Sequence, residues 1–549
     1  MELDEETATM AVGTFWSNLG VIAVKLVSFI YMILIARLVA QSEVGLFYLG
    51  IGMMGVVSIF ADLGISQTVQ RYLPYFLGKN DKASARRVLA LNIFLGLLPP
   101  LIVAFLVWQL APAIANNVRN PGLEPLLAYL AIYLFVNQVF NILLNILVAL
   151  KKMKERSVGT NLQNVLKVVF TLLLVWAIGP QAATLSIAFI LSLAAGAIYL
   201  LYVAFGVLKS QDLLPAPADL FDTAARPLLL NILPFGLTML GVSMFSLLIS
   251  YMGVLALGYL LGGAGNASIG IYSMATAFAA VANILAASVI TIFLPVASGL
   301  VSKTDSAKIT KTAQTALRWV LFSTIPVVAF LAAFAPSLLR VLYGADYESG
   351  ALTLSLFSIG TLLYYLGSVQ GTLIAAHRFV KLELIAFLFG ALANVILNFA
   401  LIPIWGINGA AFASLASFGI IAAVNHYFAR KKFGFSIPTS AWKNLFCGFL
   451  LLALLAALHA ISYDYLVHLP IPLPSGSLAG MVLDKVVKVI ILGFFMGLGC
   501  LAYLVLLNLF GLFEDEDRSV MKHLLDKMKL PAKIKASLLG FIFWGAKKD

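Results

Sequence analysis

Three ionisable side chains lie inside long apolar stretches of this sequence, at Lys25, Asp62 and Lys167. A charge held at the middle of a bilayer costs at least about 2.5–3.5 kcal/mol, so such residues usually face water, a partner charge or a transport pathway. Lys25 and Lys167 could therefore line a hydrated cavity and neutralise a phosphate. The alternative is a buried Lys25–Asp62 ion pair that only fixes helix packing.

Amide side chains form a second group with a regular spacing. Asn137, Asn141 and Asn145 are four residues apart, which places them on one face of a helix. Asn164 precedes Lys167 by three residues, so these two also share a face. We expect a wet wall that binds sugar hydroxyls, because hydrogen bonding between helices usually needs only one or two such residues.

Two arginines lie at the ends of apolar stretches. The guanidinium of Arg71 could contact a substrate phosphate, since arginine matches phosphate with paired donors, and anchoring at the membrane interface is the alternative. We expect Arg318 to be an interfacial anchor whose long side chain reaches the membrane surface.

The composition shows which elements must position these residues. The chain has 549 residues, of which 62% are apolar and 11% are charged, and its mean hydropathy is +1.00. Soluble domains are about 25% charged. We therefore expect an all-α polytopic membrane protein with about 14 transmembrane helices. The candidate spans are residues 12–38, 44–70, 88–110, 123–149, 159–178, 183–207, 229–260, 269–300, 317–334, 351–374, 382–402, 407–428, 441–463 and 482–508.

Basic residues indicate the topology. If the N-terminus lies inside, the inner connections and the tail receive 29 of the 36 Lys and Arg residues, and the outer connections receive 4. This asymmetry is what the positive-inside rule predicts for an even number of spans with both termini in the cytoplasm. It also accounts for the net charge of +12 without a nucleic-acid partner.

The first part of the chain is repeated in the second. Short motifs recur in the same order at offsets of about 221 to 226 residues, as in residues 44–48 with 269–272 and 72–74 with 293–295. Because six spans separate the copies, both run the same way through the membrane, as in transporters with two lobes. The predicted parts are an N-terminus (1–11), an N-lobe (12–208), a linker (209–228), a C-lobe (229–430), two extra spans (431–510) and a cytoplasmic amphipathic tail (511–549).

Several motifs resemble a known family. The sequences ARL at 36–38, EVGLF at 43–47, DLGI at 62–65 and QRY at 70–72 are similar to the first two spans of the polysaccharide transporter family. That family belongs to the multidrug/oligosaccharidyl-lipid/polysaccharide (MOP) exporter superfamily. The resemblance covers residues 12 to about 508. Many relatives carry an acidic residue in span seven where this chain has Gly253, so a coupling-ion role of that acid does not carry over.

The resemblance implies a flippase that moves polyprenyl-(pyro)phosphate-linked oligosaccharide across the cytoplasmic membrane by alternating access. Its partners would be the lipid-linked substrate, anionic lipids of the inner leaflet bound by the tail, and glycan polymerases or glycosyltransferases, and we expect a monomer. One alternative is a cation-coupled multidrug antiporter of the same superfamily, which would need acidic residues in its cavity. Another is a membrane partner of glycan-assembly enzymes that transports nothing.

Enzyme and cofactor signatures are missing from the sequence. There is no phosphate-binding GxxxxGK[ST] motif, and the five histidines show no metal-ligand spacing. We therefore expect no catalytic residue, metal or cofactor, and no ATP hydrolysis by this chain.

Overall fold

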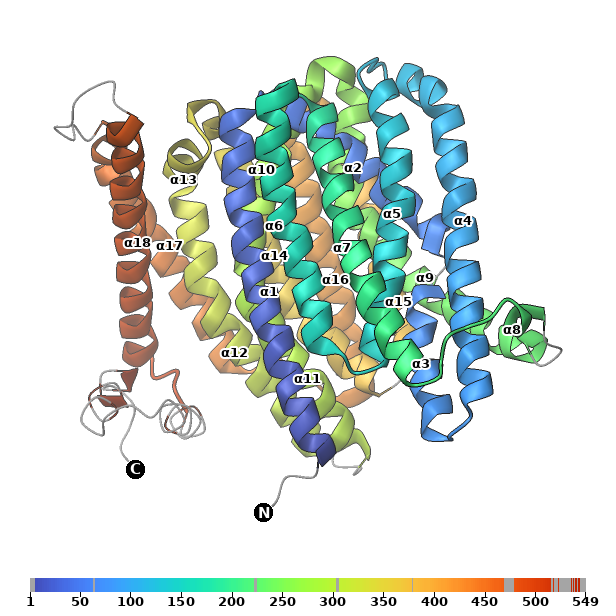
Figure 1. Ribbon diagram of the computed structural model, residues 1–549. Helices are drawn as coiled ribbons and strands as arrows, with labels where there is room; N and C mark the ends of the chain where they lie inside the picture. The colour runs from blue at the N-terminus through green and yellow to red at the C-terminus, as the bar shows by residue number, and fades with distance from the viewer. Residues whose placement is uncertain are drawn as a thin grey trace. The chain divides into compact units, whose positions relative to one another are not determined.

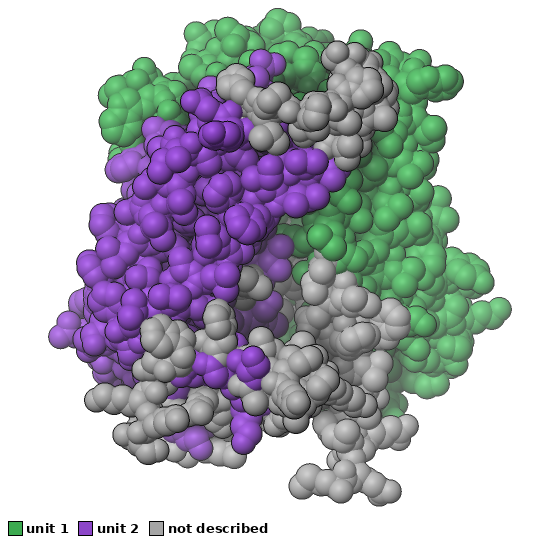
Figure 2. Space-filling view, turned by 90° about the vertical axis from the view of Figure 1, so that its left-hand side faces the viewer, with its two compact units in different colours: residues 1–274, 394–410 green, residues 275–393, 411–549 purple. Residues whose placement is uncertain are grey.

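The computed structural model describes residues 5–62, 65–221, 225–302, 306–377, 379–468 and 478–514, with isolated positions between 517 and 543. All regular secondary structure in this part of the chain is helical. The chain forms two compact units, coloured separately in Figure 2. Unit 1 comprises residues 1–274 and 394–410, and unit 2 comprises residues 275–393 and 411–549.

Unit 1 is built mainly from the first ten helices of the chain (Figure 1). They are α1 (Glu5–Leu38), α2 (Gln41–Asp62), α3 (Ile65–Gly78), α4 (Lys82–Asn117), α5 (Leu123–Ala149), α6 (Met153–Ile178), α7 (Ala182–Ser210), α8 (Ala218–Phe221), α9 (Ala225–Leu261) and α10 (Asn266–Ala279), with the 3-10 turn η1 (Gly262–Gly265) before α10.

Unit 2 contains most of the later helices. They are η2 (Ala280–Ala282), α11 (Asn283–Ser302), α12 (Ser306–Ala333), α13 (Ala335–Leu342), η3 (Ala345–Gly350), α14 (Ala351–Ala376), α15 (Val380–Trp405), α16 (Ile407–Phe433), α17 (Thr439–His468) and α18 (Leu478–Leu509). Parts of α15 and α16 belong to unit 1.

The predicted spans correspond to helices of the structure. Twelve helical stretches in the described residues are long and apolar enough to cross a membrane. Each of the 14 predicted spans falls on a long helix or on two consecutive helices. The prediction of an all-α polytopic membrane protein with about 14 spans is confirmed.

Spans two and eight differ from the prediction, because each is divided. The second span was expected to be continuous from 44 to 70, whereas α2 ends at Asp62 and α3 begins at Ile65. The eighth was expected to run from 269 to 300, whereas η2 separates α10 from α11. Interrupted helices expose backbone groups that neighbouring polar side chains can satisfy. Asp62 therefore lies at a helix end rather than inside a continuous helix.

The packing of unit 1 explains how α5 is held. Buried aliphatic side chains of α3, α4 and α5 form one cluster that includes Leu73, Leu89 and Ile146. A second cluster joins α5 to α7 through Phe140, Leu147 and Leu200. With apolar contacts on two sides, α5 directs its polar face to the remaining side.

The compact units divide the chain at different positions from the predicted lobes. Unit 1 contains α9 and most of α10, which the sequence repeat assigns to the C-lobe. Packing and repeat are separate properties, so the predicted lobe boundaries stay a prediction. Within unit 1, α9 packs along α2.

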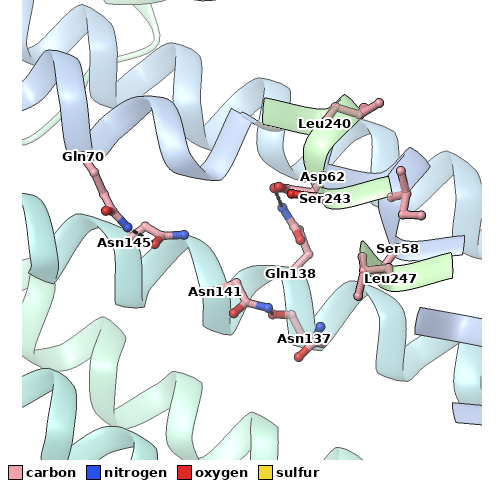
Figure 3. A pocket seen from close by; sticks show the side chains of 11 residues that line it. Ser58, Asp62, Gln70, Asn137, Gln138, Asn141, Asn145, Leu240, Ser243 and Leu247 are labelled. Atoms are coloured by element: carbon pink, nitrogen blue, oxygen red, sulfur yellow. Dashed lines mark hydrogen bonds between the residues drawn. The ribbon is translucent and has the colours of Figure 1, made fainter. Parts of the chain in front are cut away.

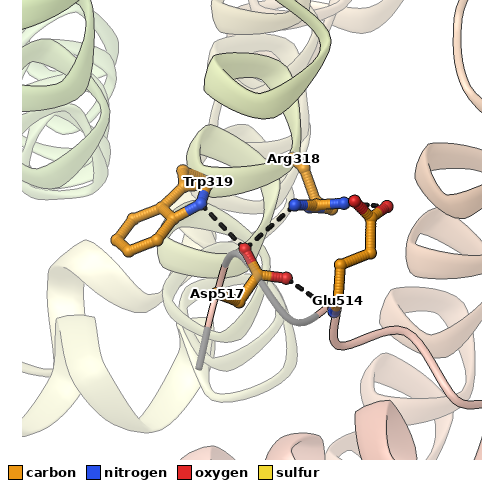
Figure 4. A network of polar contacts seen from close by, with 4 residues as sticks. All are labelled: Arg318, Trp319, Glu514 and Asp517. Atoms are coloured by element: carbon orange, nitrogen blue, oxygen red, sulfur yellow. Dashed lines mark hydrogen bonds and ion pairs between the residues drawn. The ribbon is translucent and has the colours of Figure 1, made fainter. Parts of the chain in front are cut away.

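The end of unit 2 contains a buried ion pair (Figure 4). The guanidinium of Arg318 in α12 bonds the carboxylate of Asp517 at 3.0 Å and also pairs with Glu514, and the Arg318 side chain is 4% exposed. The indole of Trp319 donates to the same oxygen of Asp517 at 3.0 Å. The expectation of an interfacial anchor at Arg318 is wrong, because acidic side chains of the tail cover this arginine. The predicted amphipathic stretch between 520 and 528 lies largely outside the described residues.

Candidate functional site

A pocket of unit 1 has a volume of about 370 Å³. It is lined by four helices, α2, α3, α5 and α9. The polar lining residues are Ser58, Asp62, Gln70, Asn137, Gln138, Asn141, Asn145 and Ser243, and the apolar ones are Ile59, Leu240 and Leu247 (Figure 3).

The asparagine stripe of α5 forms one wall of this pocket. Asn137, Asn141 and Asn145 all line it, as the spacing of four residues predicts for side chains on one helix face. The Nδ2 of Asn141 donates to the backbone carbonyl of Asn137 at 2.9 Å. The common face of the three asparagines is confirmed, and their role in binding a substrate stays a prediction.

Hydrogen bonds connect this wall to the divided second span. The Nε2 of Gln138 donates to a carboxylate oxygen of Asp62 at 2.7 Å, and Gln138 is 4% exposed. The Nε2 of Gln70 in α3 donates to the Oδ1 of Asn145. The pocket is thus bordered by both halves of span two, each tied to α5 by a side-chain hydrogen bond.

The lining has one charged group among its described residues, the carboxylate of Asp62. The remaining polar groups are five amides and two hydroxyls. An amide supplies two donors and an acceptor, so this wall can satisfy neutral groups that both donate and accept hydrogen bonds. None of its described lining residues is a cation that would bind a phosphate.

Lys167 and Asn164 form a separate cluster with α1. The ammonium of Lys167 donates to the Oδ1 of Asn164 at 3.2 Å and lies 4.6 Å from the ring centroid of Tyr31 and 5.4 Å from that of Phe189. The hydroxyl of Ser28 also donates to Asn164, at 3.4 Å. Cation–π contacts of this kind stabilise a lysine away from water. The structure therefore does not place Lys167 and Asn164 in the pocket.

Lys25 and Arg71 are exposed and do not line the pocket. The guanidinium of Arg71 lies 5.5 Å from the ring centroid of Tyr72. Arg71 follows Gln70, a pocket residue, so it is the basic residue nearest to the lining along α3. In the described part of the chain there is no ion pair between Lys25 and Asp62.

Sequence reasoning missed the α9 wall and two contributors from span two. Leu240, Ser243 and Leu247 follow helical spacing, but such apolar spacing occurs on every span and does not single out a pocket. Gln70 and Ser58 were detectable as polar residues in an apolar span. No group of three or more His, Cys, Asp or Glu side chains within the described residues has the geometry to hold a metal.

Gly253 of α9 lies against a tyrosine of α10. A Cβ built on Gly253 would lie 2.2 Å from the hydroxyl of Tyr272. Any side chain at residue 253 would collide with this tyrosine unless it moved. The phenol of Tyr272 therefore fills the space beside residue 253.

Comparison with known families identifies the chain. Residues 10–301 match a family described as "Polysaccharide biosynthesis protein". The chain belongs to this family. The matched region contains the whole pocket, including the α9 wall. A relative found by direct sequence comparison is an uncharacterized membrane protein of Methanocaldococcus jannaschii, which is 22% identical over 78% of this chain and 86% of that protein.

Solved structures with the same fold include transporters of two kinds. The lipid II flippase MurJ in an inward closed conformation aligns with 89% of this chain and 99% of its own, with 16% identity and a TM-score of 0.63. A MATE family multidrug transporter of the MOP superfamily in an inward-facing conformation aligns with 75% of this chain and 94% of its own, with 18% identity and a TM-score of 0.58. These similarities establish the fold. They agree with the family match, which confirms the resemblance to a polysaccharide family. The transport role and the placement in the MOP superfamily stay predictions.

Proposed function

We propose that this chain flips a polyprenyl-(pyro)phosphate-linked oligosaccharide across the cytoplasmic membrane by alternating access. The observation that carries this proposal is the amide-lined pocket of a polysaccharide biosynthesis family member. Three of its four helices, α2, α5 and α9, contribute to candidate spans, where a polar cavity needs a hydrophilic occupant.

The pocket chemistry suits sugars. Each sugar hydroxyl both donates and accepts, and each lining amide offers donors and an acceptor to match it. The carboxylate of Asp62 accepts from a hydroxyl, whereas it would repel a phosphate. We therefore assign the sugar part of the substrate to the wall of Asn137, Asn141 and Asn145.

The phosphate needs cations outside this wall. Arg71 adjoins the lining residue Gln70, and a guanidinium binds phosphate oxygens with paired donors. Lys25 is exposed on a spanning helix, where an ammonium facing lipid is costly, so we infer that it faces a hydrated path. For Lys167 we propose a different role, holding α1 against α6 and α7 through its ring contacts.

Flipping needs no ATP on energetic grounds. Moving one negative charge outward along an inside-negative potential releases about 2.3 kcal/mol per 100 mV. A head group with two charges therefore gains about 4–5 kcal/mol per 100 mV. Cations along the path offset the desolvation of the phosphates.

The proposal includes a topology and partners. The distribution of basic residues favours cytoplasmic termini, with the tail on the anionic inner leaflet. Glycosyltransferases or a glycan polymerase would supply and consume the substrate, and the transporter would act as a monomer.

One observation favours a second candidate, a cation-coupled multidrug antiporter. Asp62 lines the pocket, whereas Lys25 and Lys167 do not. A carboxylate in an otherwise neutral cavity could bind a cationic drug or its counter-ion. The five amides of the lining argue for the sugar, because drug cavities are mainly apolar.

Reconstitution separates the candidates. The purified protein would be placed in liposomes with a fluorescent polyprenyl-pyrophosphate oligosaccharide, and an impermeant quencher would report the share of label on each leaflet. Protein-dependent exchange supports the flippase. Efflux of cationic dyes driven by a sodium or proton gradient, without lipid exchange, supports the antiporter. Absence of both supports a partner that transports nothing.

A further inference from the structure

The helix α9 takes part in two separate features of unit 1. Its middle lines the pocket with Leu240, Ser243 and Leu247. Its last residues, Tyr259 and Leu260, are bonded to the turn between α4 and α5. At 1.5 Å per residue, Leu247 and Tyr259 are about 18 Å apart along the helix. One rigid helix thus connects the pocket to a distant polar contact.

That contact centres on Arg119. Its Nη2 donates to the carbonyl oxygens of Tyr259 at 3.4 Å and Leu260 at 3.3 Å. The last carbonyls of a helix lack intrahelical partners and carry partial negative charge, so a guanidinium is well suited to them. In return the backbone N–H of Gly263 donates to the carbonyl of Arg119 at 3.1 Å. Arg119 caps the end of α9 from a turn in the first repeat.

The neighbouring residue adds a side-chain bond. The Nδ2 of Asn120 donates to the Oδ1 of Asn266, the first residue of α10, at 2.7 Å, and Asn120 is 2% exposed. Arg119 has a φ of +53°, a conformation uncommon for residues other than glycine. This turn therefore places the two side chains against the junction of α9 and α10.

The backbones of α2 and α10 also meet here. A Cβ built on Gly45 would lie 1.7 Å from the carbonyl oxygen of Asn266, and one on Gly270 would lie 2.3 Å from the carbonyl oxygen of Gln41. Both glycines are therefore required for the close approach of the two helix starts. The start of α2 and the start of α10 are therefore in close contact, while the pocket lies at the other end of α2.

The predicted topology puts these features on different sides. Residues 41–45, 118–122 and 259–270 belong to outer connections and outer helix ends, whereas Asp62 and Gln70 belong to the inner half of span two. We propose that Arg119 and Asn120 form an outer gate, which holds the end of α9 and closes the pocket toward the outside. Opening this gate lets α9 leave the pocket wall on the outer side. This inference rests on the proposed transport function.

Accessibility of a single cysteine tests the gate without requiring the substrate. In a background with Cys447 and Cys500 replaced by alanine, Ser243→Cys reports access to the pocket through labelling by an impermeant maleimide from either side of sealed proteoliposomes. We expect the double variant Arg119→Ala with Asn120→Ala to raise labelling from the outer side at least threefold. Unchanged outer labelling would overturn the proposal.

A disulfide tests the closed state. Oxidation of the double variant Asn120→Cys with Asn266→Cys should abolish outer labelling of the reporter and stop lipid exchange, while inner labelling is retained. Reduction of the disulfide should restore outer labelling and lipid exchange. The matched control is Gln163→Cys with Ser192→Cys, which joins two helices of the first repeat. The Nε2 of Gln163 and the Oγ of Ser192 are 3.2 Å apart in the native protein. Oxidation of this control should change neither the labelling nor the lipid exchange. Lipid exchange that persists with the outer disulfide formed defeats the gate but not the flippase. Labelling that responds as expected, without lipid exchange in any variant, supports the gate and defeats the proposed substrate.

Discussion

The side-chain amide of Gln138 donates a 2.7 Å hydrogen bond to the carboxylate of Asp62, which joins the middle of α5 to the last residue of α2. A related bond occurs in unit 2, where the hydroxyl of Tyr365 in α14 donates to the backbone carbonyl of Asn283 at 3.3 Å. Asn283 begins α11, just after the division of span eight. In each unit, a polar side chain from a neighbouring span thus contacts the point where a span is divided.

Replacement of Asp62 by asparagine distinguishes a sugar pocket from a cation pocket. The amide oxygen of Asp62→Asn still accepts from Gln138 and from a sugar hydroxyl, so we expect lipid-linked oligosaccharide exchange within about threefold of the parent rate. A cation-coupled antiporter would lose activity, because the one carboxylate among the described lining residues would be gone. The leaflet-exchange assay and a dye-efflux assay on the same proteoliposomes provide the measurement.

Removal of two amides from the stripe should slow flipping. Each lost hydrogen bond is worth about 0.5–1.5 kcal/mol, so Asn141→Ala combined with Asn145→Ala should reduce exchange by about tenfold or more. The matched control is Asn161→Ala in α6, whose amide donates to the backbone carbonyls of Gly20 and Ser157 outside the pocket. Equal losses in the pocket and control variants would contradict the assignment of the stripe to sugar binding.

Much of the fold was predictable from the sequence because its signals are local. Each of the 14 predicted apolar runs coincides with helix in the described residues, and the period of 3.6 residues placed Asn137, Asn141 and Asn145 on one face. The division of span two was not predicted, because apolar residues lie on both sides of Asp62 and Gly64 and the whole stretch has the composition of one span. The packing of neighbouring helices, which the run does not encode, makes a break tolerable.

The composition of the site depended on contacts between distant segments. The spacing of Lys167 from Asn164 is the spacing expected of two residues that face one cavity. The ammonium of Lys167 instead contacts Tyr31 of α1, which is more than a hundred residues away in the sequence, and Phe189 of α7. Ser243 lines the pocket because α9 packs on α2, and no local pattern indicates that pairing. Whether Lys167 and Ser243 line the pocket depends on how their helices are rotated against the neighbouring helices.

Lys25 provides a test of the phosphate path. Its side chain is exposed on α1, and an ammonium facing lipid at mid-span would cost at least about 2.5–3.5 kcal/mol. If the ammonium instead faces the substrate phosphate, Lys25→Ala should abolish exchange without loss of folded protein, and Lys25→Arg should restore most of it. Normal exchange by Lys25→Ala, measured in the leaflet assay with equal amounts of monodisperse protein, would remove Lys25 from the path.

Asp81 should make the start of α4 sensitive to pH. Its carboxylate accepts from the backbone N–H of Ser84 at 2.9 Å as the N-cap of α4, and this hydrogen bond lowers the pKa of Asp81 below its ordinary value. A lowered pKa in the folded state means that the cap stabilises α4 above the unfolded pKa of about 3.9 and is lost as the pH falls below it. Asp81→Ala should cost about 1 kcal/mol of local stability at neutral pH. Hydrogen exchange of the first turn of α4 measures this loss, and Asp81→Asn should retain most of the cap.

Arg318 should be required for the stability of unit 2. Its guanidinium is buried with Asp517, and loss of one partner from a buried pair typically costs about 3–5 kcal/mol because a charge is left unpaired. We expect Arg318→Ala to lower the melting temperature of the detergent-solubilised protein by several degrees, with a smaller change for Asp517→Asn, which can still accept from Trp319. The matched control is Arg340→Ala, which breaks the ion pair with Glu348. In this pair the side chain of Arg340 is 36% exposed and that of Glu348 is 25% exposed. Equal melting temperatures for the Arg318→Ala and parent proteins would mean that the tail does not hold this arginine in solution, and greater proteolysis of the tail in Arg318→Ala alone would support the contact independently.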